Sequence, residues 1–228
     1  MSSEDSSRCE SISAALCARA DVLWSDGAES EAIEFYTLAA ADDYIYAIIA
    51  LARIRDEQRD YPEAFRFYAK AADLGSPYAQ YCVGTCLMAG QGVAKNATEA
   101  LEWFVRASEQ RPPGFSCAQY AVGVCYRNGD GVRQDYNQAI NWFRKAAEQG
   151  LANAQCELAD LYRAGKGTSQ DFQSAAIWYE KAAKKGFSVA QFNIGVCYEQ
   201  GIGVAKDALL AAAWFNKAAT GCEVARQA

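Results

Sequence analysis

The sequence predicts an all-α, right-handed α-solenoid of about six antiparallel helix pairs, because three landmarks recur at one spacing. An Ala-Gln pair, a Gly-x-Gly element and a Trp-aromatic pair each occur four times, starting in the first copy at Ala79, Gly90 and Trp103. Each landmark returns after 39, 36 and 36 residues. An active site is normally singular whereas the unit of an array recurs, so we interpret these stretches as scaffold.

The segment that begins with Ala-Gln predicts the first helix of each pair. In AQYAVGVCYRNG, residues 118–129, the apolar residues have helical spacing and the segment ends at glycine. A small residue recurs inside it, which we expect to let a second helix approach closely. These small residues are Gly84, Gly123, Ala159 and Gly195. The Gly-x-Gly element then supplies residues that tolerate positive φ and ends the helix.

A polar residue precedes the second helix of each pair and is predicted to be its N-cap. The four N-cap candidates are Asn96, Asp135, Asp171 and Asp207. Asn96 with Glu99, and Asp135 with Gln138, also have the spacing of a capping box. Inside the helix, alanines flank an aromatic residue, as in Ala139, Phe143 and Ala146. We expect the alanines to let the helix pack closely and the aromatic ring to interlock with the neighbouring helix.

Upstream, two shorter units of about 32 residues lack the Gly-x-Gly element. Residues 42–57 and 59–75 have the first-helix and second-helix patterns, with Pro62 at an early helical position where its missing N–H is tolerated. Residues 11–24 and 27–42 repeat the same two patterns. The expected total is therefore six helix pairs.

The charge and hydropathy patterns restrict the partners. With 22 basic and 28 acidic residues the net charge is −6, and no run of Lys or Arg forms a basic patch, so nucleic acid is not expected as a partner. The N-terminus has no apolar stretch of signal-peptide length, and no segment approaches the apolar length of a membrane span. We therefore expect a cytoplasmic protein with no membrane insertion.

Nine cysteines could indicate a disulfide scaffold, but the number is odd and the spacing is unfavourable. Cys9 and Cys17, like Cys117 and Cys125, lie eight residues apart, which on one helix is about 12 Å and beyond disulfide reach. Most cysteines are therefore interpreted as reduced core residues.

The sequence gives little support for a catalytic function. The chain has no histidine, which removes the commonest general base, the Ser-His and Cys-His nucleophile pairs and the usual zinc ligand. Cys82 and Cys86, at i and i+4, leave a redox or metal-binding alternative open. We predict no catalytic residue, no metal site and no cofactor.

The recurring small residue, the Gly-x-Gly turn, the capping aspartate and the Trp-aromatic pair followed by alanines resemble the Sel1-like repeat. The two shorter N-terminal units resemble tetratricopeptide repeats. The resemblance implies two tetratricopeptide-like helix pairs in residues 1–75, four Sel1-like repeats in residues 76–221 and a tail at 222–228, all in one continuous solenoid. It also implies a non-enzymatic adaptor or scaffold.

Some bacterial cysteine-rich members of this family resemble penicillin-binding or β-lactamase-like proteins, so a hydrolase is the alternative from another class. Those members place a bridged cysteine within the alanine pair of the second helix. This chain instead has Ala71–Ala72, Ala146–Ala147 and Ala182–Ala183 at that place. This departure disfavours the disulfide-rich secreted subgroup.

In solenoids of this family the first helices line the concave face, so residues just off the packing seam of each first helix are expected to bind a protein or peptide. The predicted set is Tyr46, Arg53, Tyr78, Tyr81, Tyr120, Arg127, Asn128, Asn153, Asp160, Arg163, Phe192 and Glu199, with Thr85 and Gln200 beside them. Tyrosine and arginine are enriched at binding hot spots. The alternative for each tyrosine is that it pads the inner packing layer. An aromatic half and a charged half of the set indicate an extended peptide or helix as the ligand.

The last predicted helix, residues 208–221, carries almost no charge over its first eight residues. This predicts an apolar end face that could serve a homodimer or a self-associating structural assembly subunit. The alternative is that the tail continues the helix and folds back.

Overall fold

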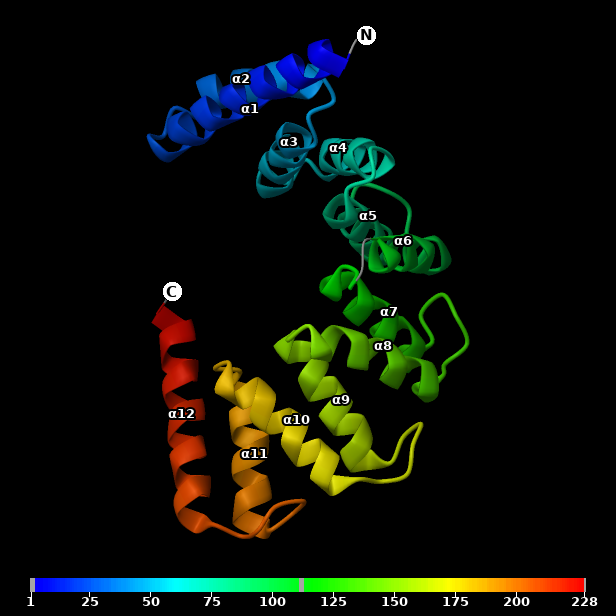
Figure 1. Cartoon of the computed structure of the whole chain (residues 1–228), viewed down its shortest axis with the longest axis vertical. Helices are drawn as coiled ribbons and strands as arrows, with labels where there is room; N and C mark the ends of the chain where they lie inside the picture. Colours follow the sequence, from blue (N-terminus) through cyan, green and yellow to red (C-terminus); the bar gives the residue numbers. More distant parts are fainter. Residues whose placement is uncertain (1–2, 111–112, 228) are drawn as a thin grey trace. The chain divides into compact units, whose positions relative to one another are not determined.

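The computed structural model describes residues 3–110 and 113–227, with side chains described over 11–110 and 113–221. Within these ranges the secondary structure consists of twelve α-helices without any strand (Figure 1), which confirms the predicted all-α solenoid of six helix pairs. The helices are α1 (Ser3–Ser25), α2 (Glu29–Ala41), α3 (Ile45–Glu57), α4 (Tyr61–Asp73), α5 (Pro77–Ala89), α6 (Ala97–Glu109), α7 (Ser116–Asn128), α8 (Tyr136–Glu148), α9 (Ala152–Ala164), α10 (Phe172–Lys184), α11 (Ser188–Gln200) and α12 (Ala208–Gln227). Across the described helices, none has both the length and the apolar character needed to cross a bilayer.

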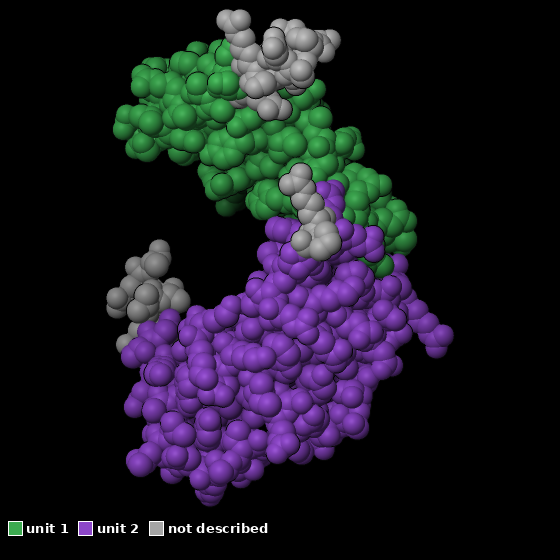
Figure 2. All heavy atoms as spheres, viewed as in Figure 1, with its two compact units in different colours: residues 1–107 green, residues 108–228 purple. Residues whose placement is uncertain are grey.

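The chain divides into two compact units, residues 1–107 and residues 108–228 (Figure 2). In each unit the helices pair in chain order, as α11 and α12 show by running side by side (Figure 1). The second helix of one pair packs on the first helix of the next, for example α8 on α9 and α10 on α11. We call the first helix of each pair the A helix and the second the B helix.

Each A helix meets its B helix where a small residue faces an aromatic ring. A Cβ atom added to Gly123 would lie 2.6 Å from the ring of Phe143, which is fully buried. Gly84 with Phe104 and Gly195 with Phe215 have the same geometry. The other three pairs hold alanine and tyrosine at the equivalent positions, all buried. These are Ala20 with Tyr36, Ala52 with Tyr68 and Ala159 with Tyr179.

The Gly-x-Gly turn has the predicted backbone geometry. Gly165 caps α9 in the left-handed region with φ 64°, and Gly167 has φ 73°. A Cβ atom on Gly167 would lie 2.5 Å from the backbone of Tyr136, at the start of the preceding B helix. The turn therefore needs glycine here for its backbone conformation and for the close approach of two repeats.

The four predicted N-caps are present, but the capping boxes are only half formed. Asp135 accepts hydrogen bonds from the backbone N–H groups of Asn137 at 2.8 Å and Gln138 at 3.1 Å. Asn96, Asp171 and Asp207 cap their helices in the same way. The reciprocal bond of a capping box is missing because the N–H of Asp135 donates to the carbonyl of Tyr126, on the A helix, at 2.9 Å. The N-cap thus also ties the B helix to its A helix.

The glutamine of the Ala-Gln landmark joins successive pairs. Gln155 is buried, and its Nε2 donates to the carbonyl of Ala147, in the last turn of the preceding B helix, at 3.0 Å. Gln80 and Gln191 bond to Ala72 and Ala183 in the same way. Each of these carbonyl groups also accepts from a backbone N–H in the turn after its helix, such as that of Gly150 for Ala147 at 2.9 Å, so the glutamine adds a bond between successive pairs.

The seven cysteines with described side chains are free thiols, in agreement with the prediction of reduced residues. Four are buried and three are half-buried; the side chains of Cys9 and Cys222 lie outside the described residues. Burial raises the pKa of Cys82 and of Cys156 to about 12. The thiolate is the reactive form, so these thiols are poor nucleophiles and metal ligands near neutral pH.

We expect Gly123→Ala to lower the free energy of unfolding by about 1–3 kcal/mol, because the new methyl group overlaps the Phe143 ring. This loss exceeds the gain in helix propensity, which is at most about 1 kcal/mol. Urea denaturation of the full chain provides the measurement. In the Phe143→Leu background the same substitution should cost much less, and simple additivity of the two costs would contradict the steric explanation.

The raised thiol pKa values predict a stability that falls in alkali. Unfolding restores the thiols of Cys82 and Cys156 to their ordinary pKa of 9.0, so above that pH the unfolded chain releases protons that the folded chain holds up to about pH 12. The contribution of these thiols to stability should therefore be constant below about pH 8, and stability should decline as the pH rises from about 9 to 12. Denaturation at graded pH, together with mass-spectrometric mapping of thiols labelled in native buffer and in urea, checks this. Rapid native labelling of either cysteine at pH 7 would contradict it.

Candidate functional site

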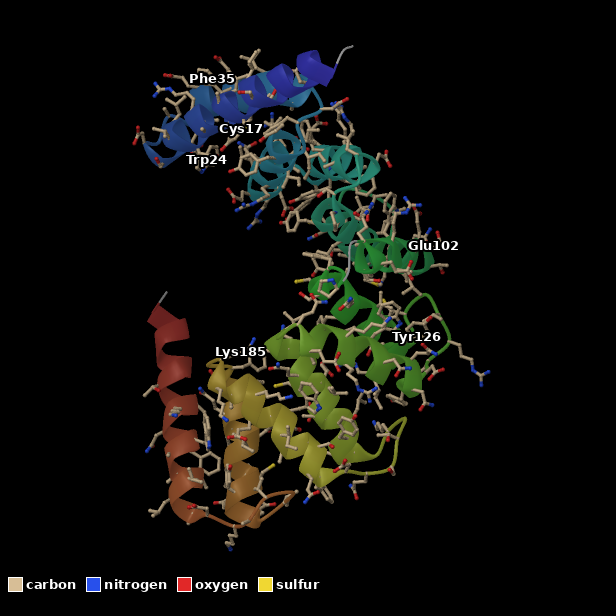
Figure 3. The ribbon with its side chains drawn as sticks, in the orientation of Figure 1. Cys17, Trp24, Phe35, Glu102, Tyr126 and Lys185 are labelled. Atoms are coloured by element: carbon tan, nitrogen blue, oxygen red, sulfur yellow. The ribbon has the colours of Figure 1, made fainter. Side chains whose placement is uncertain are left out.

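In unit 1 the A helices α1 and α3 border a pocket of about 230 Å³. Its polar lining comes from Asp21 on α1, from Tyr36 on α2 and from Tyr46, Arg53 and Glu57 on α3. The remaining wall is apolar and consists of Trp24, Ile49, Ala50 and Ile54. Trp24 projects from α1 on the side that faces α3 (Figure 3).

Two tyrosine hydroxyl groups hold the Asp21 carboxylate in this pocket. Tyr36 donates to Oδ1 at 2.5 Å, and Tyr46 donates to the same carboxylate at 3.0 and 3.1 Å. Burial, and then the hydrogen bond to Asp21, raise the pKa of Tyr36 above its ordinary range. The carboxylate therefore has a fixed position on the A-helix side of the pair.

The same tyrosine–aspartate element occurs in unit 2. The hydroxyl of Tyr179, a fully buried residue of α10, donates to Oδ1 of Asp160 on α9. Arg163, one turn further along α9, donates through Nε to the Tyr179 hydroxyl at 3.2 Å and through Nη2 to Asp160 at 3.4 Å. Here a carboxylate, a hydroxyl and a guanidinium form one network on the A-helix face.

A larger, open groove of about 600 Å³ runs over α7 and α9. Arg127 and Asn128 line it from α7, and Glu157, Asp160 and Arg163 line it from α9. Arg127 forms an ion pair with Glu157 that links the two A helices. Burial opposes the charge of Arg127, but the hydrogen bond and charge of Glu157 outweigh it and raise the pKa of the guanidinium.

Three aromatic residues of the predicted set pack against the aromatic residue of their own B helix. The ring centroids of Tyr120 and Phe143 lie 5.6 Å apart. Tyr81 with Phe104 and Phe192 with Phe215 lie at 5.7 and 5.5 Å. These rings therefore contribute to the inner packing layer, as the alternative for the tyrosines states, although Phe192 keeps 55% of its surface exposed.

The structure brings some predicted residues together and leaves others apart. Tyr46 and Arg53 share the pocket of unit 1, whereas Arg127, Asn128, Asp160 and Arg163 share the groove of unit 2. The others are outside these two hollows: Tyr78 is 40% exposed near the start of α5, Thr85 donates to the carbonyl of Tyr81, and Asn153, Glu199 and Gln200 are exposed on α9 and α11.

The sequence analysis missed Asp21, Trp24 and Tyr36, which form much of the pocket in unit 1. A signal for them exists in the sequence. Asp21 and Asp160 each follow the alanine that faces a B-helix tyrosine, so the Ala-Asp dipeptide together with that tyrosine marks the element.

The predicted apolar face on α12 is exposed in part. Leu209 and Leu210 keep 86% and 42% of their surface exposed. The backbone of α12 continues as a helix to Gln227, which is the first part of the alternative for the tail. Self-association through this face stays a prediction. In the part of the chain with described side chains, no three His, Cys, Asp or Glu residues gather in a way that could hold a metal ion.

Comparison with known proteins gives a consistent result. The model of the Sel1 repeat family matches six segments, which are residues 27–44, 51–76, 77–111, 118–151, 152–187 and 188–221. A protective antigen of uropathogenic Escherichia coli with an SLR fold matches 96% of this chain and 49% of its own, with 30% identity and a TM-score of 0.84. A Sel1 repeat protein from Oxalobacter formigenes matches 90% of this chain and 85% of its own, with 27% identity and a TM-score of 0.80.

A curated relative is chitin synthase regulatory factor 2 of Schizosaccharomyces pombe, 44% identical over 52 residues. That match covers 23% of this chain and 10% of the relative. The chain thus spans about a tenth of this relative's length and about half of the E. coli antigen's.

We expect Tyr179→Phe to destabilise the protein by about 1 kcal/mol, because it removes a hydroxyl that donates to Asp160 and accepts from Arg163. Urea denaturation measures the change. Tyr198→Phe, a matched substitution at a half-buried tyrosine of α11 in the same unit, should change stability by less than about 0.5 kcal/mol. In the Asp160→Asn background the effect of Tyr179→Phe should shrink, and an undiminished effect would show that the hydroxyl does not act through Asp160.

Proposed function

Because the chain belongs to the Sel1 repeat family, we propose that it is a non-enzymatic adaptor that binds a segment of another protein along the exposed faces of its A helices. Proteins built from Sel1 repeats generally mediate protein–protein interactions. The proposal adds where the partner binds and with which residues.

The observation that carries the proposal is the contrast between two adjacent A-helix positions. The position that faces the B-helix aromatic residue holds only glycine or alanine in all six pairs. The next residue along holds Asp21, Arg53, Thr85, Val124, Asp160 and Val196 in the six pairs. The first position keeps the packing of the helix pair constant, and the second can vary from repeat to repeat. A repeat array can therefore adapt its surface to a ligand without changing its packing.

Within unit 2 the A helices offer both polar and apolar contacts. Arg127 and Arg163 contribute guanidinium groups in the groove over α7 and α9. On α11, Val189 and Phe192 keep 58% and 55% of their surface exposed. An extended segment with an acidic or amide-rich part and an apolar part would find partners for both.

The proposal assigns no catalytic residue, cofactor or metal. The hydrolase alternative resembles cysteine-rich proteins with bridged cysteines, whereas the seven cysteines described here are free. The groove carboxylates Glu157 and Asp160 are engaged by Arg127 and by Tyr179 with Arg163, so they act as structural charges.

The test is affinity capture from an extract of the source cells with the full chain and a variant carrying Arg127→Glu and Arg163→Glu. We expect the variant to retain its partner roughly tenfold less well or worse, because it reverses two groove charges. The matched control carries Lys145→Glu and Lys181→Glu, the same charge change on B helices of the same unit, where each lysine stacks on a tryptophan.

Capture should be unchanged for this control, and quantitative mass spectrometry compares the three baits. Circular dichroism first verifies that all three are folded. Equal capture by the groove variant and the wild type would overturn the proposal.

A further inference from the structure

The tyrosine–aspartate element occurs in both units, but only one copy contains a cation. In unit 2 the element is complete: Arg163, three residues after Asp160, donates to the aspartate and to the tyrosine hydroxyl. In unit 1 the residue three positions after Asp21 is Trp24. The element of unit 1 thus has the same acceptor groups and no guanidinium from its own helix.

Among the residues with described side chains, no other one supplies that cation. Over residues 11–110, for which side chains are described, no Lys or Arg forms an ion pair with Asp21. Arg53 also lines the pocket, but among these described residues it forms no ion pair with Asp21 or with Glu57. A carboxylate held by two tyrosine hydroxyls therefore faces the pocket without a counter-ion.

The remaining walls suit a guanidinium on an aliphatic stem. Trp24 offers an aromatic face on which a guanidinium can stack, and Glu57 offers a second carboxylate. Ile49, Ala50 and Ile54 form an apolar wall for methylene groups. A volume of about 230 Å³ lies below the range of roughly 300–1,000 Å³ that is typical of small-molecule sites, so one side chain is the fitting occupant.

We propose that this pocket binds an arginine side chain of the partner protein. The guanidinium takes up, at Asp21 and Tyr36, the place that Arg163 occupies at Asp160 and Tyr179. Trp24 covers it on one side. The inference rests on the proposed adaptor function and adds to it the chemical identity of one anchor in the ligand.

The experiment is an NMR titration of the ¹⁵N-labelled full chain with N-acetyl-arginine amide, followed at the backbone amide of Ala50 in the pocket wall. The matched probe is N-acetyl-citrulline amide, which has nearly the same shape without the charge. We expect saturable shifts with the arginine probe and binding weaker by about tenfold or more with the citrulline probe. N-acetyl-glutamate amide should produce no saturable shift at Ala50.

Three variants and one control variant locate the site. Asp21→Asn should weaken binding of the arginine probe by about tenfold or more, whereas Asp26→Asn, an equal change outside the pocket, should leave it unchanged. Trp24→Arg rebuilds the Asp-x-x-Arg sequence of α9, so its own guanidinium should occupy the site and block the probe. Glu57→Gln, at an exposed position, should also weaken binding, and thermal melting verifies that all the variants are folded.

Equal affinity for citrulline and arginine, preferential binding of the glutamate probe, or full binding by folded Asp21→Asn would each overturn the proposal. The capture experiment separates this failure from that of the adaptor function. A partner that is lost with the Arg127 and Arg163 variant but retained by Asp21→Asn leaves the adaptor function intact and removes the arginine pocket. If the arginine probe binds saturably but the wild type and the Arg127 and Arg163 variant capture partners equally, the arginine pocket stands and the proposed groove function fails.

Discussion

The contact between a small A-helix residue and a B-helix ring is the constraint on which each helix pair depends. At Gly123 there is no room for even one further carbon atom beside Phe143, so the ring itself sets the distance between the two helices. Protein interiors are close-packed, so the two helices cannot slide past each other by small amounts. The distance between the helices therefore also fixes where their ends lie. The N-cap bond from Asp135 to Tyr126 and the glutamine bond from Gln155 to Ala147 can form only when those ends are in register.

This contact exists in two versions, and the version determines what the A-helix face presents. Where glycine meets phenylalanine, an aromatic residue three positions before the glycine covers the ring, as Tyr120 covers Phe143. Where alanine meets tyrosine, that position holds Cys17, Ile49 or Cys156 instead. In two of these three pairs the tyrosine hydroxyl extends to an aspartate on the A helix. A buried hydroxyl needs a hydrogen-bond partner, so a core substitution of Phe by Tyr places a polar group on the variable face.

The repeat period was enough to predict the helix pairs and turns, because the positions that form them accept few residue types. Glycine at Gly165 and Gly167, alanines on the B helices and an aspartate or asparagine at the N-caps that follow the Gly-x-Gly turns recur for reasons that are local in sequence. The groove over α7 and α9 was predictable in part, since Arg127 and Arg163 hold the same A-helix position, which carries other residue types in the other four pairs. The pocket of unit 1 was not predicted, because it combines Asp21 with Tyr36 and Tyr46 from two further helices, and the reach of a tyrosine hydroxyl cannot be read from periodicity. The buried role of Gln155 was missed for the same reason, since its partner lies on another helix.

The residue three positions after the aspartate decides whether the tyrosine–aspartate element is closed or open. In unit 2, Arg163 is tethered to the same helix as Asp160, and a tethered group has an effective concentration that a free ligand rarely matches. A ligand in the groove of unit 2 therefore contacts the cations that line it, Arg127, Arg163 and Lys166, without displacing Arg163 from the element. In unit 1 the tethered cation is replaced by Trp24, so the same acceptors are left for a group from outside the chain. One substitution in a repeated element thus converts an internal ion pair into a place for a ligand, which lets an array acquire a binding site without any change to its packing.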